Sequence, residues 1–509
     1  MLDVGHERPE SVLPGATLAQ LRDRLADPVA YFLGDSFESV LFPTQGTEYY
    51  GFPPSKSYIF TGTPPQFRWR VEGFAPLASF ARGGLAEAWT AGVYPFNDAE
   101  LADFPFTYAD IAPYYDLVAQ RIGISGEVDD LARFMPVHQH LLPPLDLDEH
   151  SSLILRTYAE RRASLNRRLG CYIGRSRIAT ISRDREGRQA CSYLGRCLWG
   201  CPSDSLYTPS ITLAECRRHD RFRYVSGVYV RYFRTNAHRR ITAVVVDTGP
   251  GKASEDVPVD TLALGAGTLS SCKIFLESVF RETGQLVTLH GLMDNQQILM
   301  PFVNVRMLGR QYDPNTYQYH QVGLGLEGST PREYVHGQIT TLKTAMIHPI
   351  VQRVPFDLRT SLFLFRNLHA ALGLVNINLH DTRRDHNTVV LEPASGETDG
   401  RLLVHYETGP AEAERIRHAM RRVRRVLRRL GCFVPPGMAH VRPMGASVHY
   451  CGLLPMSRAR DPWTTSSLGQ SHDFDNLFFV DGTTFPFLPA KNLTFSLMAN
   501  AARIADCAF

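Results

Sequence analysis

Residues 448–506 contain three short motifs, HYCG at 449–452, NLFFVDG at 476–482 and NLTFSLMA at 492–499. The second motif reads as a buried strand that ends in an Asp–Gly turn, and the third reads as a helix. Asn492 is a favoured N-cap residue, so we expect the helix to begin there. The start of such a helix directs its positive dipole end and free amides at whatever precedes it. The stretch therefore predicts a strand, a turn and a helix that hold a group which becomes anionic, close to His449.

The order and spacing of these motifs resemble the C-terminal signature of the glucose–methanol–choline (GMC) flavin oxidoreductases. The resemblance implies that His449 is the acid/base and that Asn492 is its partner on the substrate oxygen. It also implies FAD contacts from Asp481, Gly482 and Thr494. Plainer interpretations remain: one histidine among 18 is more often a hydrogen-bonded or surface residue, and Asn492 can be a helix cap alone.

Length and composition describe a globular protein of more than one core. A chain of 509 residues predicts two closely packed domains, and 44% hydrophobic with 21% charged residues is typical of such proteins. The net charge of +3 is too small to indicate nucleic acid, and no apolar run has membrane-spanning length. Nine cysteines without a dense pairing pattern favour a reducing compartment or a metal role. We expect a cytoplasmic location, or a periplasmic one if an upstream signal or a partner subunit exists.

The first residues, MLDVG at 1–5, read as the end of the second strand of a dinucleotide-binding unit, with Asp3 on the adenosine ribose. The first strand, the glycine-rich turn and the first helix of that unit are missing before it. We expect that the true start lies upstream; the alternative is a protein that has lost normal FAD binding. The motif GLGLEG at 323–328 matches G-x-G-x-x-G, but no apolar helix follows it, so we expect a strand and a turn there.

Two further glycine motifs resemble flavin-facing segments of the family. RGGLAEAWTAG at 82–92 has two adjacent glycines, which permit close approach of the backbone to a ligand, although an ordinary turn is the alternative. LALGAGTLS at 262–270 reads as a buried strand, a turn and a helix start, and a purely structural turn is again the alternative. The resemblance implies cofactor contacts at Gly83, Gly84, Trp89, Val230, Ala266 and Gly267.

Cys191, Cys197 and Cys201 are separated by five and three residues and end in a Cys-Pro pair. Short spacings of this kind let one loop wrap an iron–sulfur core, whereas a structural zinc site needs a fourth ligand. Three reduced, buried thiols are the plain alternative. The pattern is similar to that of the flavoprotein subunit of bacterial FAD-dependent glucose dehydrogenases. That resemblance implies a 3Fe-4S cluster and a protein partner that receives electrons.

The character of the sequence changes near residue 299. Strand-like runs at 299–307, 317–326, 371–379, 389–391 and 402–406 predict a mostly antiparallel sheet. The expected fold class is α/β, with a Rossmann-like FAD-binding domain over 1–298 and 433–509 that lacks its first βα unit. A substrate-binding domain with flanking helices is expected over 299–432, and residues 8–80 are a candidate lid. The arginine-rich helix expected over 412–430 has a face that we expect to be solvated, with an anionic surface or nucleic acid as the alternative.

Together these patterns predict FAD-dependent oxidation of a hydroxyl group, on a sugar or another alcohol, with His449 as general base. The first alternative is a truncated or flavin-less relative that binds but does not catalyse. The second is a flavoprotein with non-redox chemistry, such as a lyase. We expect no nucleic acid partner and no transmembrane segment.

Overall fold

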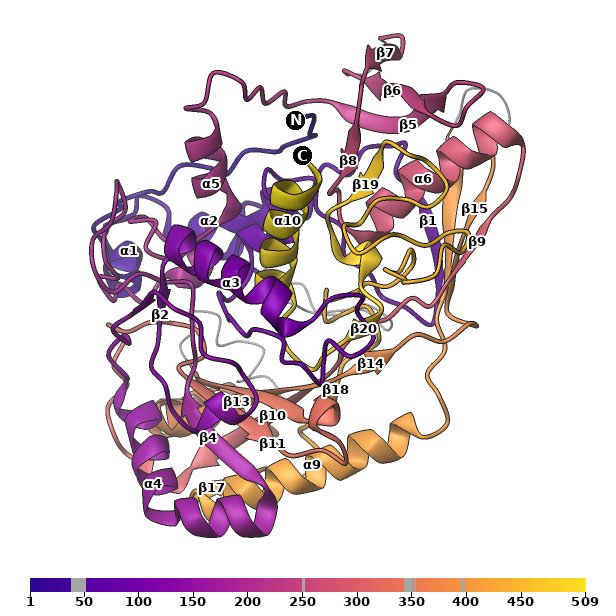
Figure 1. Cartoon of the computed structure of the whole chain (residues 1–509). Helices are drawn as coiled ribbons and strands as arrows, with labels where there is room; N and C mark the ends of the chain where they lie inside the picture. Colours follow the sequence, from indigo (N-terminus) through magenta and orange to yellow (C-terminus); the bar gives the residue numbers. More distant parts are fainter. Residues whose placement is uncertain (38–51, 250–251, 343–350, 352–353, 395–398) are drawn as a thin grey trace.

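The computed structural model describes residues 1–37, 52–249, 252–342, 351, 354–394 and 399–509. These residues form a lower part, built on one large sheet, and an upper part with several smaller sheets (Figure 1). The N- and C-termini both lie in the upper part (Figure 1).

The large sheet has seven strands in the order β17-β10-β13-β12-β11-β4, with β18 paired to β10 beside β17. Its strands are β4 (Cys171–Arg175), β10 (Gln296–Asn304), β11 (Val322–Leu326), β12 (Val335–Thr341), β13 (Leu372–Leu379), β17 (Cys432–Phe433) and β18 (His440–Val441). Every pairing in it is antiparallel, which confirms the predicted antiparallel character. The predicted membership was partly wrong, because the runs at 389–391 and 402–406 lie in a separate four-stranded sheet and the strand at 335–341 was not predicted. The glycines of the G-x-G-x-x-G match at 323 and 325 lie within β11, as expected of a strand.

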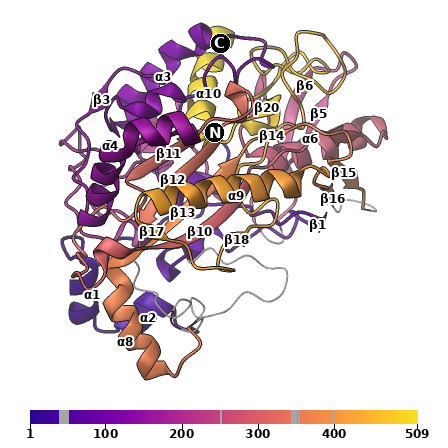
Figure 2. The same cartoon turned by 90° about the horizontal axis from the view of Figure 1, so that it is seen from below.

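Two long helices, α4 (Glu149–Leu169) and α9 (Glu412–Arg429), lie against one face of this sheet, which we call the outer face (Figures 1 and 2). Because strand side chains alternate between faces, Ile298, Val375 and Ile377 point outward and pack with Val423 and Leu427 of α9. The Asp148 side chain caps the start of α4, and Gly170 ends that helix in the left-handed conformation. The predicted helix over 412–430 is thus confirmed.

The upper part contains a parallel pair, β8 (Leu262–Leu264) and β19 (Leu477–Phe479). Beside it are a four-stranded sheet of β1 (Trp69–Glu72), β16 (Arg401–His405), β15 (Thr388–Glu392) and β9 (Thr288–His290), and a three-stranded sheet of β5 (Tyr229–Thr235), β6 (Ile241–Asp247) and β7 (Glu255–Pro258). Helix α6 (Thr268–Thr283) follows β8 and shares a buried core with these strands. The strand, turn and helix predicted from residue 262 are confirmed.

The C-terminal helix α10 (Thr494–Ala508) lies beside α3 (Tyr108–Ile122) in a second core (Figure 1). Tyr115 of α3 and Ser496 of α10 share a buried hydrogen bond with 2.6 Å between their oxygens. The C-terminal helix was predicted from the sequence and is confirmed, although it begins at Thr494, two residues later than expected. The chain also contains the short strands β2 (Ile124–Ser125), β3 (Leu141–Leu142), β14 (Asp381–Thr382) and β20 (Phe487–Leu488) and the helix α5 (Pro209–Cys216).

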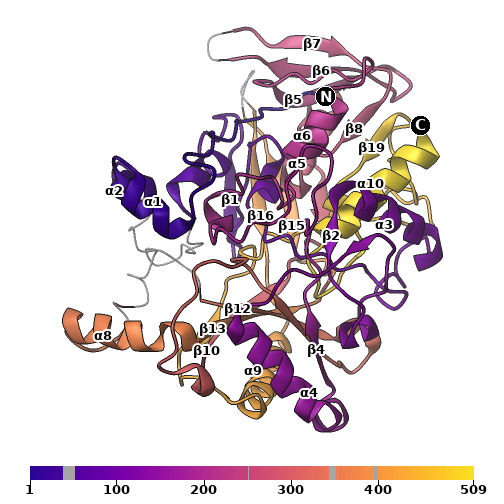
Figure 3. The same ribbon diagram turned by 90° about the vertical axis from the view of Figure 1, so that its left-hand side faces the viewer.

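The candidate lid over 8–80 contributes α1 (Leu18–Arg24), α2 (Pro28–Leu33) and strand β1. Helices α1 and α2 lie on the same side of the molecule as α8 (Leu358–Leu368), as Figure 3 shows. Residues 38–51 of the candidate lid lie outside the described residues, and a role as a lid stays a prediction.

The predicted domain boundaries also stay a prediction. Strand pairing places residues from both predicted ranges in each large sheet, because β4 joins the seven-stranded sheet while β15 and β16 pair with β9 and β1. Within the part of the chain that is described, none of the helices combines the length and the apolar character needed to cross a membrane.

Candidate active site

The turn that joins β8 to α6 presents open backbone at a helix N-terminus. Residues 265–267 are exposed, Gly267 has φ +87°, and a Cβ atom placed on it would meet no atom within 4 Å. Helix α6 is 16 residues long, so its positive dipole end and first amides face this turn. Ala266 and Gly267 therefore lie where an anionic group of a ligand can approach the backbone.

Asp481 fixes this turn from behind. Its carboxylate accepts hydrogen bonds from the Gly267 amide at 3.0 Å and from the Ser271 hydroxyl at 2.5 Å. Burial raises the pKa of Asp481, and these donors oppose that rise. The neighbouring Gly482 lies so close to Thr268 that an added Cβ would be 3.0 Å from the Thr268 hydroxyl oxygen. The structure thus brings together four of the predicted residues, although the carboxylate of Asp481 is occupied by contacts within the protein.

His449 lies on a loop held by two consecutive residues, Asp294 and Asn295. Asp294 accepts hydrogen bonds from the Gly445 amide at 2.6 Å and from the Ser447 hydroxyl, and its burial raises its pKa to about 7. The Ser447 hydroxyl in turn accepts a hydrogen bond from the His449 amide at 3.0 Å. This chain of contacts fixes the backbone that presents the imidazole.

Asn295 determines which imidazole nitrogen is free to accept a proton. Its amide nitrogen donates to the carbonyls of Leu379 at 3.0 Å and Pro489 at 2.8 Å, so its oxygen must serve as the acceptor. That oxygen lies 3.1 Å from Nδ1 of His449, which assigns the proton of the neutral ring to Nδ1 and the lone pair to Nε2. Burial, and secondarily the charge of Arg442, lowers the pKa of His449 to about 4. The ring is therefore neutral near pH 7.

The residue before the histidine has a backbone that its type rarely adopts. Val448 has φ +58°, in the left-handed region. For a β-branched side chain this conformation is strained, and such strain persists only where surrounding contacts enforce it. The contacts of Asp294 supply that enforcement.

Asn492 does not cap a helix, so that prediction was wrong. Helix α10 begins at Thr494, its N-cap is Leu493, and no side chain caps it. The oxygen of Asn492 instead accepts a hydrogen bond from the Gln338 amide nitrogen of β12 at 2.8 Å. This tertiary contact turns the side chain toward the large sheet and away from the helix start. Thr494 is the first residue of the helix and is half-buried.

A buried ion pair anchors the residue before Asn492. The ammonium of Lys491 donates to Glu100 at 2.5 Å and to the carbonyls of Pro95 and Phe134 at 2.7 and 2.8 Å, and both charged side chains are completely buried. Burial lowers the pKa of Lys491 and raises that of Glu100, while their mutual attraction opposes both shifts. The anchor fixes the loop from which Asn492 reaches Gln338.

The face of the large sheet opposite α4 and α9 is polar, and we call it the inner face. It carries His336 and Gln338 of β12 together with Asn376 and Asn378 of β13. The Nε2 atom of His336, both amide atoms of Asn378 and the oxygen of Asn376 are buried without a hydrogen-bond partner among the described residues. Such atoms are costly to bury unless a ligand or water satisfies them.

The inner face lies next to His449. The pKa of His336 is well below its ordinary value, first because of burial and then because of the positive charge of Lys491, and the neighbouring imidazoles of His320 and His449 further disfavour its protonation. His320 is also buried, its Nε2 is likewise unpaired within the described segments, and burial lowers its pKa to about 4. Both rings are neutral near pH 7, so each can donate and accept hydrogen bonds.

Sequence reasoning missed His320, His336, Gln338 and the Asp294–Asn295 pair. A signal for two of them was present, because VHGQIT at 335–340 alternates apolar and polar residues with a period of two. That alternation indicates a strand with one polar face. The remaining three residues come from two other segments, and only the tertiary structure places them near His449.

The other predicted cofactor contacts lie in the upper part. Gly83 and Gly84 have φ +95° and +62°, so both need the freedom of glycine, and open space surrounds Gly84. The indole of Trp89 donates to the Tyr207 carbonyl at 2.7 Å. These positions stay predicted contacts.

Asp3 accepts a hydrogen bond from the Tyr224 hydroxyl at 2.9 Å. Its carbonyl accepts from the Val228 amide at 3.0 Å, which places it beside the segment that leads into Val230. Burial raises the pKa of Asp3. The pairing brings Asp3 close to the segment of Val230, another predicted cofactor contact, and the role of both residues stays a prediction.

The cysteine cluster is not supported. Cys191, Cys197 and Cys201 line one pocket, but its volume is about 20 Å³, roughly that of one water molecule. Burial raises the pKa of Cys191 to about 11, which disfavours the thiolate that binds metal. The described residues contain no group of three or more His, Cys, Asp or Glu side chains that could hold a metal ion. The protein electron acceptor inferred from this cluster loses that support.

Comparison with known proteins finds one family and several relatives. A family model described as GMC oxidoreductase matches residues 383–501. The chain is 24% identical to 2-methyl-1,2-propanediol dehydrogenase of Mycolicibacterium austroafricanum, over 79% of this chain and 74% of that protein. It is 23% identical to paromamine 6'-oxidase of Streptomyces fradiae, over 86% of this chain and 80% of that protein.

Two solved structures have the same fold. Pyridoxine 4-oxidase from Mesorbium loti matches with a TM-score of 0.55 and 15% identity, covering 87% of this chain and 88% of that one. An FAD-dependent oxidoreductase from Chaetomium thermophilum matches with a TM-score of 0.57 and 12% identity, covering 99% and 93%. The predicted fold class is confirmed by these neighbours together with the antiparallel large sheet.

Proposed function

The chain belongs to the GMC oxidoreductase family, and on that premise we propose that it oxidises a hydroxyl group of a sugar or another polar alcohol, with His449 as the base. The observation that carries the proposal is the polar inner face beside His449, whose buried imidazole and amide atoms have no partner in the described part of the chain. An alcohol rich in hydroxyl groups can satisfy these donors and acceptors, whereas an apolar substrate leaves them unpaired.

The residues present fit FAD at its flavin end. The exposed turn of Gly265, Ala266 and Gly267 offers backbone amides and a helix dipole to an anionic group, and the space beside Gly267 is open among the described residues. When bound, FAD supplies the acceptor for the hydride that leaves the carbinol carbon. Gly83, Gly84, Trp89 and Thr494 are proposed as further contacts, and Asp481 as the residue that holds the turn in shape.

His449 takes the hydroxyl proton in this proposal. Its Nε2 lone pair is the only basic position of the ring, because Nδ1 faces the acceptor oxygen of Asn295. The substrate loses this proton and a hydride, and a carbonyl group forms. Burial opposes a charged imidazolium, so we expect the proton to move only as the hydride leaves. Asn492, held by Gln338, orients the substrate oxygen.

The first test is anaerobic reduction of the FAD-loaded protein by candidate alcohols and sugars. The reduction is measured as a loss of flavin absorbance. We expect His449→Ala to lower the reduction rate by about 10²–10⁴-fold, as is typical for removal of a general base, with FAD still bound. His418→Ala is the matched control, because His418 is an exposed histidine of α9. Reduction by the His449 variant at the control rate would refute the assigned role.

The pH dependence sharpens this test. The folded pKa of His449 lies near 4, so the imidazole is neutral at every higher pH. Titration of His449 should therefore add no step at the ordinary histidine pKa, and the reduction rate should fall as the pH approaches 4. A step near pH 7 that persists in the absence of histidine titration is assigned to Asp294, whose pKa is about 7. A step near pH 6.5 that disappears in His449→Ala would contradict the buried, neutral ring.

The same experiment separates the alternatives. A protein that binds FAD but is bleached by no alcohol would favour non-redox chemistry. A protein that binds alcohols or sugars but no FAD would favour a binding role without catalysis.

A further inference from the structure

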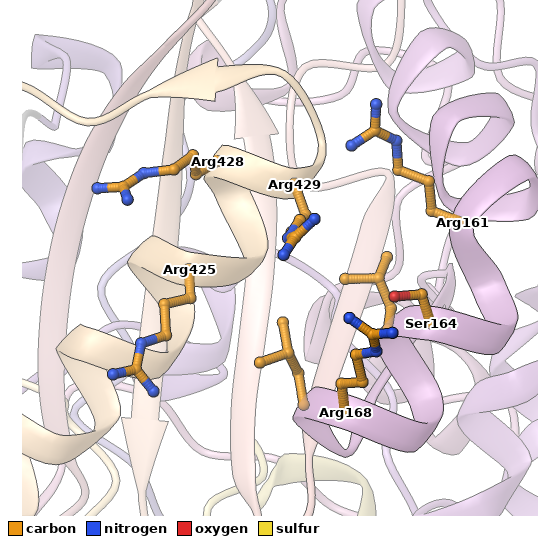
Figure 4. A pocket seen from close by; sticks show the side chains of 8 residues that line it. Arg161, Ser164, Arg168, Arg425, Arg428 and Arg429 are labelled. Atoms are coloured by element: carbon orange, nitrogen blue, oxygen red, sulfur yellow. The ribbon is translucent and has the colours of Figure 1, made fainter.

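A second site lies on the outer side of the large sheet, between the C-terminal ends of α4 and α9. The pocket there has a volume of about 420 Å³. We call it the arginine pocket, and its lining residues are Arg161, Ser164, Leu165, Arg168, Leu169, Arg425, Arg428 and Arg429. Figure 4 shows Arg168 and Arg429 reaching into the gap between the two helices from opposite sides, with Arg161 farther along α4.

The five guanidinium groups of this pocket have no acidic partner in the described ranges, and all five arginines are exposed. Their neighbours on the same helices behave differently. Arg162 of α4 pairs with Asp130 at 2.5 Å, and Arg422 of α9 donates to the carbonyls of Glu327 and Leu169 at 2.6 and 3.0 Å. Arginines without a partner also occur elsewhere on α9, such as Arg424, whose Nε atom is buried and unpaired among the described residues. The feature particular to the pocket is that Arg168 and Arg429 point into the same gap, whereas Arg425 and Arg428 extend to the other side of α9 (Figure 4).

Stabilisation of the helix ends explains part of this charge but not all of it. Each helix C-terminus carries the equivalent of about half a negative charge, so the two ends offset about one of the five positive charges. Arg425 and Arg429 are four residues apart on α9, a spacing at which like charges repel. About four positive charges remain without a counterpart among the residues that the structure describes.

We propose that the arginine pocket binds the polyphosphate group of a small soluble molecule. Arginine suits this ligand because its planar donors match phosphate oxygens in pairs. The hydroxyl of Ser164 adds a donor, and the half-buried Leu169 supplies an apolar contact for the rest of the molecule. A pocket of this volume is in the range that holds one small ligand.

This site is separate from the one around His449. The arginine pocket opens between the helices of the outer face, whereas His449 and Asn492 lie toward the inner face. Binding at the arginine pocket is therefore measurable without any catalytic readout, and its test does not depend on the proposed oxidation.

The test is calorimetric titration of the full chain with tripolyphosphate, pyrophosphate and orthophosphate at matched ionic strength. We expect saturable binding that strengthens in the order orthophosphate, pyrophosphate, tripolyphosphate, and that weakens with added salt. The double variant Arg168→Ser/Arg429→Ser should bind tripolyphosphate about 100-fold more weakly, about tenfold for each charged hydrogen-bonding group removed.

Arg417→Ser is the matched control, because Arg417 is exposed on α9 but does not line the pocket. Its affinity for tripolyphosphate should equal that of the unmodified chain. Equal weakening in the control and the double variant would overturn the proposal, since it would indicate general attraction to a basic helix. So would the absence of saturable binding at physiological salt. Binding to phosphatidylserine vesicles without binding to tripolyphosphate would also overturn it in favour of a lipid surface.

Discussion

The two faces of the seven-stranded sheet differ in whether their buried side chains have partners within the protein. On the outer face, Ile377 of β13 is completely buried against the apolar side chains of α4 and α9. On the inner face, the adjacent residue Asn378 is equally buried, yet both of its amide atoms lack a partner among the described residues. Adjacent residues of one strand therefore point to opposite faces, one of which is a packed apolar core and the other a buried polar surface with unpaired atoms.

This difference indicates that the outer face mainly stabilises the fold, whereas the inner face is suited to binding another molecule. Apolar packing on the outer face is complete without any ligand, so it stabilises the fold in every state. The inner face holds polar atoms whose cost is recovered only when another molecule pairs with them. Residues of the inner face should accordingly affect stability and substrate recognition in opposite directions.

The largest expected change in stability comes from placing a polar side chain, like those of the inner face, on the outer face. Ile377→Asn removes buried apolar volume and buries an unpaired amide, so the free energy of unfolding should fall by about 5 kcal/mol. Urea denaturation of the purified variant measures this loss. A change of less than about 1 kcal/mol, within the range of a surface substitution, would break the comparison.

The next effect tests how the inner face is held. Lys491→Met leaves Glu100 buried without its partner, so the free energy of unfolding should fall by about 3–5 kcal/mol. Denaturation by urea gives the value, and flavin reduction should also slow because Asn492 loses its anchor. Arg401→Met, which removes a half-exposed ion pair with Glu392, is the control and should cost at most about 1 kcal/mol. Similar losses in both variants would show that the buried pair has no special structural role.

The smallest effect has the opposite sign. Asn378→Leu replaces two unpaired polar atoms with apolar ones, so the chain should gain about 1 kcal/mol of stability. The same variant should be reduced more slowly by its best polar alcohol, because a hydrogen-bonding group is lost from the inner face. Thermal denaturation and anaerobic reduction measure the two effects. A variant that is both less stable and unchanged in reduction would contradict the role assigned to the inner face.

Local patterns predicted much of this fold. The turn at Gly265–Gly267 and the strand before it could be predicted, because glycines favour turns and a short apolar run favours a strand whatever the rest of the chain does. The helix over 412–430 was readable from the apolar stripe that includes Val423 and Leu427. The assignment of β4 to the large sheet was not readable, because its pairing with β11 joins residues about 150 positions apart.

The candidate site was predicted less completely. His449 was found from a motif, but its partner Asn295 lies on a different segment, and nothing local marks it. Asn492 was assigned the wrong local role, since an asparagine before a helix has a favourable cap position yet here bonds to Gln338. Cys191, Cys197 and Cys201 were over-interpreted, because spacing along a loop does not reveal whether the space between three thiols can hold a metal core.

The left-handed backbone at Val448 has a consequence for the order in which the molecule assembles. An unfolded segment would rarely visit that conformation, at a cost of about 1–2 kcal/mol for a residue with a side chain. The loop before His449 can adopt its final conformation only after Asp294 is positioned to accept its hydrogen bonds. The imidazole should therefore be among the last groups to become ordered during folding. Ordering of the loop that carries His449 would then follow formation of the seven-stranded sheet.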